Sequence, residues 1–340
     1  MRVLVTGHHG YIGAVMTRVL REEGHQVVGL DTFFYEDCGF GRDDEPIEAI
    51  RKDVRDVTPA DLAGFDAVIH LAALSNDPLG ELKADWTDDI NFRGSLRLAQ
   101  AAKAAGVARY LFSSSCSMYG AAGDDVLNED APLRPLTSYA TSKVRTEEAV
   151  SKLADRDFSP VFLRNATAYG VSARLRADIV LNNLVGWAFT TGKVRILSDG
   201  SPWRPIVHIE DISRAFAVAM TAPRETVHNQ AFNVGANGEN YRVRDLADIV
   251  LATVPGSKVE YAGQGGSDPR NYRVDFRKFA RAFPDFQPRW NARLGARELY
   301  SAYQEAGLTK EDFLGRKYVR LNQLKHLLAQ GRLDDSLRWR

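Results

Sequence analysis

The amino-acid sequence predicts an α/β protein with a doubly wound parallel sheet and a smaller mixed α/β lobe toward the C-terminus. Short apolar runs alternate with longer helical patterns through the first half of the 340 residues. Because the runs are continuously apolar, we expect strands buried on both faces, as in a parallel sheet between two layers of helices. A glycine-rich turn at residues 6–13 separates the first run from the first helical pattern, which is where such folds bind phosphates.

The predicted elements of the first domain follow in strand–helix order. Helices are expected over 13–24 and 91–106, because each pattern is amphipathic or alanine-rich and ends at a glycine suited to a helix C-cap. The predicted strands are residues 2–5, 26–30, 67–73, 109–114 and 160–164.

The alternation loosens after about residue 170, which indicates a second lobe. A strand and a helix over 205–220, followed by another strand, continue the first pattern and predict that the chain returns to the first domain. We expect a nucleotide-binding domain over 1–170 joined by 205–235, and a substrate lobe made of 171–204 and 236–340.

The last thirty or so residues form a separate predicted element. Thr309 can cap a helix with Asp312 three residues on. Apolar side chains then recur at helical spacing, at Tyr318, Leu321, Leu324 and Leu328. This helical extension is expected to pack on the substrate lobe, to contribute to a dimer, or to present a solvated face.

Composition excludes several classes of function. Lysine plus arginine equals aspartate plus glutamate, 44 each, so no net field attracts nucleic acid or an anionic membrane. The two cysteines, Cys38 and Cys116, are too few for a disulfide framework or a metal knuckle. No secretory leader or membrane span is evident in the sequence. We therefore expect a cytoplasmic protein that binds neither nucleic acid nor membrane.

The turn "TGHHGYIG" has glycines at Gly7, Gly10 and Gly13. Small residues there let the backbone approach a pyrophosphate at the N-terminus of the following helix. Asp31 ends the next predicted strand, and a carboxylate there accepts both ribose hydroxyls while repelling a 2′-phosphate, which favours NAD over NADP. A turn without a ligand is the alternative.

His8 and His9 fill the gap between the glycines. Adjacent residues rarely converge on one ion and no third ligand stands near them in the sequence, so we expect no metal. Both are interpreted as loop residues above the phosphates, with a minor role for His9.

Four segments together resemble the extended short-chain dehydrogenase/reductase family over residues 1 to about 290. "TGHHGYIG" resembles its TGxxGxxG motif, and "KDVRD" (52–56), "HLAA" (70–73) and "NFRGS" (91–95) resemble its later cofactor-lining segments. The resemblance implies a Rossmann domain with NAD as cofactor. The cofactor contacts it implies are Gly7, Gly10, Tyr11, Ile12, Gly13, Asp31, Asp53, Val54, Leu71, Ala72, Ala73, Asn91, Tyr139 and Lys143.

"SYATSKV" places Tyr139 and Lys143 four residues apart on one face of a predicted helix. An ammonium beside a phenol favours the phenolate, so the pair can act as a base. Ser115, in "FSSSCSMYG" at a strand end, matches the family position that hydrogen-bonds the reacting hydroxyl. Cys116 is interpreted as a packing residue, because no paired histidine motif supports a nucleophilic thiol.

The two positions after Ser115 discriminate between reactions. Family members that dehydrate or decarboxylate nucleotide sugars carry acidic residues there, whereas this chain has Cys116 and Ser117. The missing carboxylates disfavour 4,6-dehydration and decarboxylation and favour redox chemistry at one carbon.

The second half resembles the substrate segments of nucleotide-sugar epimerases. Arg204 and Arg270 stand in these segments, and two arginines suit a diphosphate because each guanidinium donates two parallel hydrogen bonds. Asp268 and Asp275 are expected near the nucleotide or supporting its loop, and His208 is expected to be a packing or hinge residue. The implied substrate-binding residues are Ser75, Ser117, Thr167, Asn183, Arg204 and Arg270.

Two positions depart from the family pattern. Thr167 stands where many relatives have asparagine, and Ser75 where some galactose epimerases have lysine. Both changes touch the predicted sugar-diphosphate site, so the resemblance does not extend to galactose epimerase itself.

The sequence thus predicts a homodimeric, NAD-dependent epimerase of a nucleotide-diphosphate sugar, acting at C4. An NAD(H)-dependent nucleotide-sugar ketoreductase or dehydrogenase is the alternative. A 4,6-dehydratase, a non-sugar alcohol dehydrogenase and a non-catalytic dinucleotide sensor are less favoured.

Overall fold

A computed structural model describes residues 1–41, 46–75, 83–261 and 270–340. Asp268, one of the expected nucleotide-site residues, lies outside the described residues.

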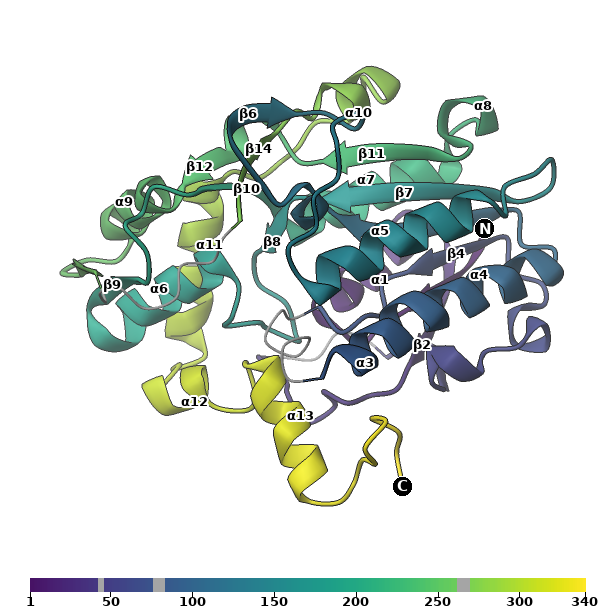
Figure 1. Ribbon diagram of the computed structural model, residues 1–340. Coiled ribbons are helices and arrows are strands. Elements are labelled where there is room, and N and C mark those ends of the chain that lie inside the picture. The colour runs from purple at the N-terminus through teal and green to yellow at the C-terminus, as the bar shows by residue number, and fades with distance from the viewer. Residues whose placement is uncertain (42–45, 76–82, 262–269) are drawn as a thin grey trace.

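A seven-stranded parallel sheet forms the centre of the larger domain and confirms the predicted doubly wound fold (Figure 1). The strand order switches at β1, because β2 and β3 lie on one side of it and the later strands lie on the other. Such a switch point is where these sheets bind ligands. All five predicted strands are present, and the third ends earlier than expected, at His70. In spatial order the strands are β11 (Gln230–Val234), β7 (Ser159–Asn165), β5 (Arg109–Ser115), β4 (Ala67–His70), β1 (Arg2–Thr6), β2 (Gln26–Asp31) and β3 (Ala49–Arg51).

Helices cover both faces of this sheet, because alternate residues of each buried strand point to opposite sides. Val3 and Val5 share one apolar cluster with α1 (Tyr11–Glu22) and α7 (Ile209–Thr221). Leu4 belongs to the cluster on the other face. That face is covered by α3 (Ala84–Thr87), the π-helical turn η3 (Asp88–Gly94), α4 (Ser95–Ala104) and α5 (Ser138–Ser151).

A second lobe has its own apolar cluster, built mainly from helices. Its helices are α6 (Val180–Thr191), α9 (Val243–Thr253), α11 (Ala292–Glu305) and α12 (Lys310–Leu314). Three small sheets accompany them: β8 (Thr167–Tyr169) with β10 (Trp203–His208) and β12 (Asn240–Arg242), β9 (Lys193–Ile196) with β13 (Lys258–Tyr261), and β6 (Ala121–Leu127) with β14 (Asn271–Val274). The remaining short elements are η1 (Val54–Asp56), η2 (Pro59–Leu62), η4 (Cys116–Tyr119), α8 (Arg224–Val227), η5 (Asn237–Glu239) and α10 (Arg277–Ala282).

The C-terminal extension, predicted as one element on the substrate lobe, in a dimer contact or with a solvated face, is divided between the two lobes. Thr309 caps the short α12 as predicted, and Phe313 of α12 packs on α6 against Gly186. The chain then breaks, and α13 (Arg320–Ala329) with the residues after it lies along the sheet domain below α3 (Figure 1). The apolar side chains that join it to the cluster of Leu4 are Leu324, Leu327, Leu333 and Leu337. This burial draws the end of the chain onto the nucleotide-binding domain.

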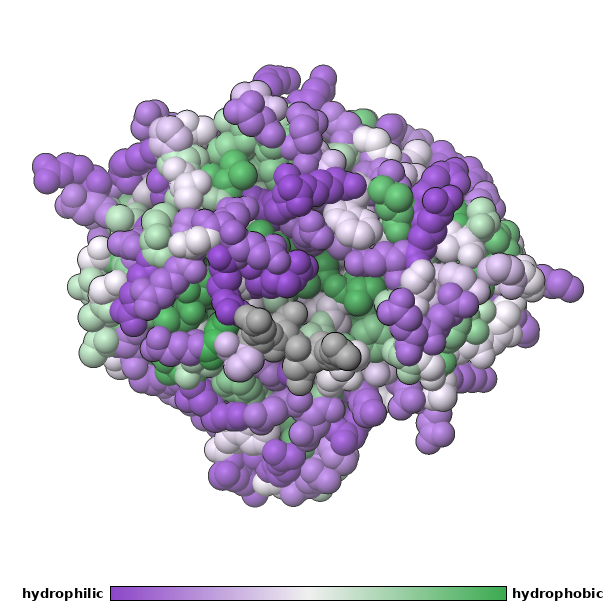
Figure 2. Space-filling model, turned by 180° about the vertical axis from the view of Figure 1, so that it is seen from behind, coloured by the Kyte–Doolittle hydropathy of each residue, from purple (hydrophilic) through white to green (hydrophobic). Residues whose placement is uncertain are grey.

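The surface is mainly hydrophilic on the face shown in Figure 2, with hydrophobic residues gathered near its middle. Among residues outside the three gaps, we find no helix with the length and hydrophobicity needed to traverse a bilayer.

Candidate active site

The glycine turn between β1 and α1 can form only with glycines at two of its positions. Gly7 has a φ of +74°, and its amide donates to the carbonyl of Leu30 at 2.8 Å. A Cβ on Gly13 would lie 2.1 Å from the carbonyl oxygen of Gly7, and a Cβ on Gly7 would lie 2.7 Å from the amide of Ala72. The turn therefore brings bare backbone to the N-terminus of α1, where amides can bind an anion.

A buried histidine joins the ends of β1 and β4 beneath this turn. His70 Nδ1 lies 2.6 Å from Thr6 Oγ1 and its Nε2 lies 2.7 Å from Ser95 Oγ. Burial lowers the pKa of His70 to about 3, so the ring is neutral and accepts one of these hydrogen bonds. This network is not among the features predicted from the sequence, although a histidine that ends an apolar strand is a usable signal for a buried hydrogen-bonded ring.

Asp31 ends β2 beside the glycine turn, as predicted for a ribose ligand. Its carboxylate accepts hydrogen bonds from the amides of Phe33 at 2.8 Å and His9 at 3.1 Å. Burial raises the pKa of Asp31, while these amides oppose the shift. His8 is buried against Gly29, and burial lowers the pKa of its imidazole. Within the described ranges, no three His, Cys, Asp or Glu residues are grouped to hold a metal ion.

Asp53, the expected adenine contact, is held in an ion pair. Its carboxylate accepts Arg55 Nε at 3.0 Å and Arg55 Nη2 at 2.7 Å, and Val54 beside it is buried. The same guanidinium donates to the carbonyls of Ser336 at 2.8 Å and Leu337 at 3.2 Å. The predicted adenine end of the site therefore touches the C-terminal extension.

Asn91 is predicted to contact the cofactor, and in the structure its side chain holds a neighbouring segment. Its Oδ1 accepts the Leu74 amide at 2.8 Å and its Nδ2 donates to the Leu74 carbonyl at 3.0 Å. Asn91 is 1% exposed. These bonds to Leu74 hold the C-terminal end of the segment 71–73. The three residues of this segment follow β4 and are half-buried.

Tyr11 points its side chain between the two lobes. Its hydroxyl donates to the Gly170 carbonyl at 2.8 Å and accepts Asn182 Nδ2 at 3.0 Å. A role of Tyr11 at the pyrophosphate would therefore use its backbone. Ile12, beside it, packs against the apolar clusters of α1. Asn182 is a positioning residue that the sequence analysis missed, because only the folded chain brings it to Tyr11.

The predicted catalytic residues lie on β5 and α5, which meet at the C-terminal edge of the sheet. Ser115 ends β5, and Thr137 caps α5 so that Tyr139 and Lys143 lie one turn apart. The Lys143 ammonium donates to the Ser113 carbonyl at 2.6 Å and lies 5.5 Å from the centre of the Tyr139 ring. Burial lowers the pKa of Lys143 to about 7. A nearby phenolate would restore its charge, so the two groups favour each other's ionisation.

Ser115 and the next two residues form a compact turn. Ser115 Oγ donates to Ser117 Oγ at 2.9 Å and accepts the Ser117 amide at 3.2 Å. The Cys116 thiol is fully buried and donates to the Arg164 carbonyl at 3.1 Å. Burial raises the pKa of this thiol, so Cys116 is neutral packing.

The two predicted diphosphate arginines lie together. Arg204 Nη1 donates to the carbonyl of Arg270, and also to that of Trp203 at 2.8 Å. Arg204 is buried on β10, and Arg270 precedes β14. The fold thus joins the Arg204 guanidinium to the backbone of Arg270, 66 residues away.

The other predicted substrate-loop residues have intramolecular partners. Asn183 Nδ2 donates to the Ala177 carbonyl at 2.7 Å. Asp275 accepts the amide and the guanidinium of Arg277, each at 2.9 Å, and so supports the turn after β14.

Ser75 lies beside an arginine that the sequence analysis did not single out. Arg176 Nη1 donates to Ser75 Oγ at 2.8 Å, and its Nε pairs with Asp178 at 2.9 Å. Thr167, which lies in β8 opposite Ile206, is half-buried. Arg176 and Asp178 lie in the long connection between β8 and α6, where periodicity gives no signal.

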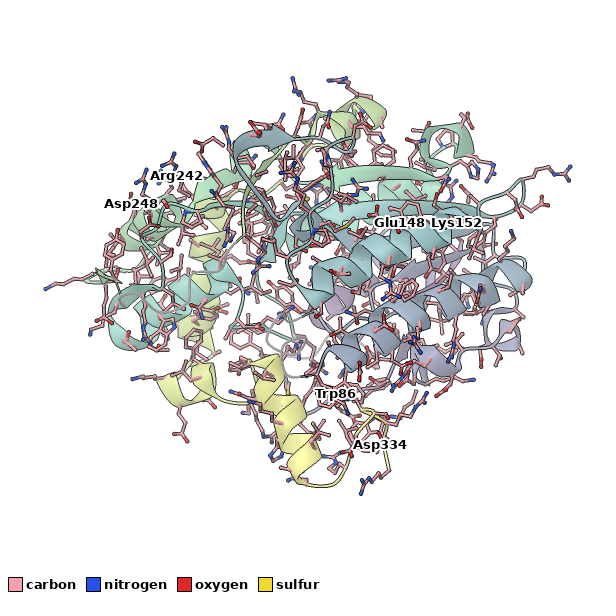
Figure 3. The ribbon with its side chains drawn as sticks, viewed as in Figure 1. Trp86, Glu148, Lys152, Arg242, Asp248 and Asp334 are labelled. Atoms are coloured by element: carbon pink, nitrogen blue, oxygen red, sulfur yellow. The ribbon has the colours of Figure 1, made fainter. Side chains whose placement is uncertain are left out.

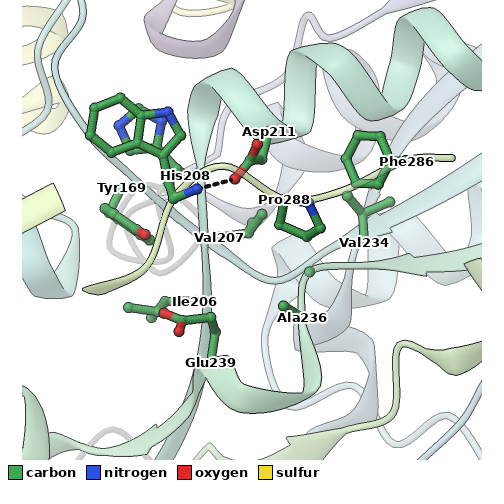
Figure 4. A pocket seen from close by; sticks show the side chains of 12 residues that line it. Tyr169, Ile206, Val207, His208, Asp211, Val234, Ala236, Glu239, Phe286 and Pro288 are labelled. Carbon is green, nitrogen blue, oxygen red and sulfur yellow. Dashed lines mark hydrogen bonds between the residues drawn. The ribbon is translucent and has the colours of Figure 1, made fainter. Parts of the chain in front are cut away.

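A small separate cavity lies between β10, α7 and the segment before α11 (Figure 4). Its volume of about 10 Å³ suits one water molecule. His208 stacks on Trp290 at 4.0 Å between ring centres, and its Nε2 lies 2.9 Å from Glu298. Asp211 accepts the amides of Arg289 and Trp290. The twelve residues that line this cavity include none of the predicted site residues, and His208 packs as expected.

Comparison with known sequences identifies the family. A model of the NAD dependent epimerase/dehydratase family matches residues 3–235. The chain belongs to this family, and it is an NAD-dependent enzyme of the short-chain dehydrogenase/reductase type, as its motifs predict.

Individual relatives agree with this assignment. UDP-glucose 4-epimerase from Corynebacterium glutamicum is 30% identical over 268 residues, which are 73% of this chain and 79% of the relative. UDP-glucose 4-epimerase from Mycolicibacterium smegmatis is 30% identical and covers 75% of this chain and 83% of its own. Among solved structures, MoeE5 in complex with UDP-glucuronic acid and NAD is 27% identical with a TM-score of 0.78, covering 90% of this chain and all of its own.

The residues at the sheet edge fit NAD. The backbone around Gly7 and Gly13 is packed so closely that neither position has space for a Cβ. The backbone amides at the start of α1 therefore stay accessible. Asp31 offers a carboxylate beside the turn, and Tyr139 and Lys143 of α5 lie by the end of β5, where Lys143 donates to the Ser113 carbonyl. When bound, NAD supplies a hydride acceptor that can return the hydride.

Proposed function

We propose that this enzyme epimerises a nucleotide-diphosphate sugar at C4 through a 4-keto intermediate. One observation carries the proposal: the buried Lys143 ammonium contacts the Tyr139 ring at the strand end that carries Ser115, and that end lacks acidic residues at positions 116 and 117. Such a site can move one proton at one hydroxyl, but it offers no acid at these positions to expel a C6 hydroxyl.

The chain's own residues divide this work. Tyr139 removes the proton of the C4 hydroxyl, Lys143 favours the phenolate, and Ser115 hydrogen-bonds the same oxygen. The keto-sugar then presents its other face, and Tyr139 returns the proton. Because oxidation and reduction balance within one turnover, no external oxidant is consumed.

The remaining predicted residues would hold the two ligands. Arg204 and Arg270 suit the substrate diphosphate because their guanidinium-bearing segments are joined at one place. The proposal places Asn183, Ser75, Ser117 and Thr167 around the same substrate. NAD would lie along the glycine turn, Asp31 and the segments at 53–54 and 71–73. We also propose that the protein is cytoplasmic and forms a homodimer. Size-exclusion chromatography with light scattering tests the dimer.

The test is incubation with UDP-, dTDP-, GDP- and CDP-sugars in deuterated water, with and without added NAD(H), followed by NMR. The proposal predicts a C4 epimer without added cofactor and without carbon-bound deuterium. Deuterium at C5 would contradict it, because C5 exchange means dehydration or C5 epimerisation. A requirement for stoichiometric NADH would instead establish the ketoreductase.

A further inference from the structure

The C-terminal extension reaches the cofactor site through two separate contacts. Trp339 Nε1 donates to the carbonyl of Thr32, the residue after Asp31, at 2.6 Å. The Arg55 guanidinium, whose side chain is 1% exposed, joins Asp53 to the carbonyls of residues 336 and 337. The extension is thus tied to the backbone of the residue after Asp31 and, through Arg55, to the Asp53 carboxylate.

Further hydrogen bonds fasten the same segment along the edge of the site. Gln323 Nε2 donates to the Phe34 carbonyl at 3.0 Å. Trp86 Nε1 and Lys83 Nζ both donate to the Asp335 carbonyl, at 2.7 and 2.9 Å. Figure 3 shows the labelled Trp86 of α3 near Asp334 of the extension. These bonds hold the extension against the sheet domain at two places along its length, Gln323 and Asp335.

Arg320, the first residue of α13, makes a third contact between the extension and the rest of the protein. This contact does not use all of its hydrogen-bond donors. Its Nη2 donates to the Arg174 carbonyl at 2.9 Å, and its guanidinium lies 3.9 Å from the centre of the Tyr35 ring. Arg320 is 5% exposed, yet its Nη1 has no hydrogen-bond partner among the described residues. A buried charged donor without a partner is unfavourable, so a ligand oxygen is the natural complement.

Two features place Arg320 beside the cofactor site. The side chain of Arg174, whose carbonyl Arg320 holds, contacts the His9 ring of the glycine turn. Gln323, three residues after Arg320, also donates to the carbonyl of Phe34, three residues after Asp31. Arg320 thus lies beside the loop that follows Asp31 and beside Arg174, which contacts the glycine turn.

We propose that residues 320–340 form the outer wall of the adenosine half of the NAD site, with Arg320 donating to an oxygen of that half. Asp53, Arg55 and Trp339 hold this wall closed, so NAD leaves only when the segment opens. The extension thereby makes NAD a resident group rather than an exchangeable one. This role concerns the cofactor alone and is independent of the sugar.

The test compares Arg320→Gln with Lys325→Gln, a matched loss of charge at an exposed position of the same helix. The purified proteins are assayed for bound NAD and for its release rate after dilution into an NAD-trapping enzyme. We expect release roughly 10- to 100-fold faster for Arg320→Gln, as for loss of one charge-assisted hydrogen bond, and wild-type release for Lys325→Gln. Equal release from both variants would overturn the proposal.

Thermal unfolding with and without NAD separates ligand binding from simple structural support. Ligand that binds only the folded state raises Tm by an increment that depends on affinity. We expect a smaller NAD-induced increment for Arg320→Gln. An unchanged increment, with apo and NAD-bound forms destabilised alike, would overturn the proposal.

A second variant serves if Arg320→Gln does not fold. Trp339→Phe removes the hydrogen bond to Thr32 while keeping a ring against Phe34. Faster NAD release from this variant supports the closed wall, and wild-type release contradicts it.

Discussion

The Lys143 ammonium lies 5.5 Å from the centre of the Tyr139 ring, one turn along α5, and is fixed by the Ser113 carbonyl of β5. Helix α5 sets the spacing between the two residues, and the bond to the end of β5 holds the Lys143 ammonium in its buried position. Because the ammonium is buried, a phenolate is its most favourable new partner. This pair is the centre of the proposed chemistry.

Tyr139→Phe should lower the turnover rate by roughly 10²- to 10⁴-fold, because it removes the proposed acid–base group. Steady-state kinetics on the substrate found by NMR measures the loss, and NAD content checks that the site still binds. An active Tyr139→Phe enzyme would show that another group moves the proton.

Lys143 should make stability depend on pH. Its pKa is about 7 in the folded protein and ordinary in the unfolded chain, so between about pH 7 and 10.5 the unfolded chain binds the extra proton. Wild-type stability relative to Lys143→Met should therefore rise over that window, by on the order of a few kcal/mol. Urea unfolding at several pH values measures it. Parallel curves for the two proteins would contradict the lowered pKa of Lys143, and exposed Lys152→Met is the control.

Gly13→Ala should abolish NAD binding, because the added methyl would lie 2.1 Å from the Gly7 carbonyl oxygen and force the turn apart. Gly238→Ala is the matched control, since a Cβ there meets no heavy atom within 4 Å. NAD titration by calorimetry distinguishes them. Normal binding by Gly13→Ala would remove the glycine turn from the site.

Glu147→Gln should destabilise the fold by about 3 kcal/mol, because it leaves the buried Arg164 guanidinium without its charge partner. Arg164 Nη2 lies 2.7 Å from Glu147, and both side chains are under a tenth exposed. Glu148→Gln, at the neighbouring exposed position labelled in Figure 3, should change stability by less than about 0.5 kcal/mol. Equal unfolding midpoints in guanidinium chloride would show that the ion pair is dispensable.

The sequence predicted the sheet and the catalytic edge because those features are written in local patterns. Apolar runs mark buried strands, and the glycines of the first turn occupy positions where backbone contacts leave no room for a side chain. The spacing of Tyr139 and Lys143 is a helical spacing, so their pairing also followed.

Long-range partners could not be predicted in this way. The bonds of Asn182 to Tyr11 and of Arg176 to Ser75 span 171 and 101 residues and depend on how the lobes pack. The extension was predicted to pack on the substrate lobe, to contribute to a dimer or to present a solvated face. Leu324 and Leu337 reach the sheet domain, which helical periodicity alone could not reveal. A carboxamide such as Asn91 gives no sequence sign of whether it faces a ligand or a backbone.

The most direct test of C4 epimerisation is the fate of the C4 hydrogen. The accepted nucleotide sugar would be prepared with deuterium at C4 and converted in ordinary water without added NAD(H), and the product analysed by NMR and mass spectrometry. The proposed function predicts that the deuterium remains at C4 of the epimer, because the hydride is removed and returned within one active site. Loss of the label to solvent or to an external cofactor pool would contradict it.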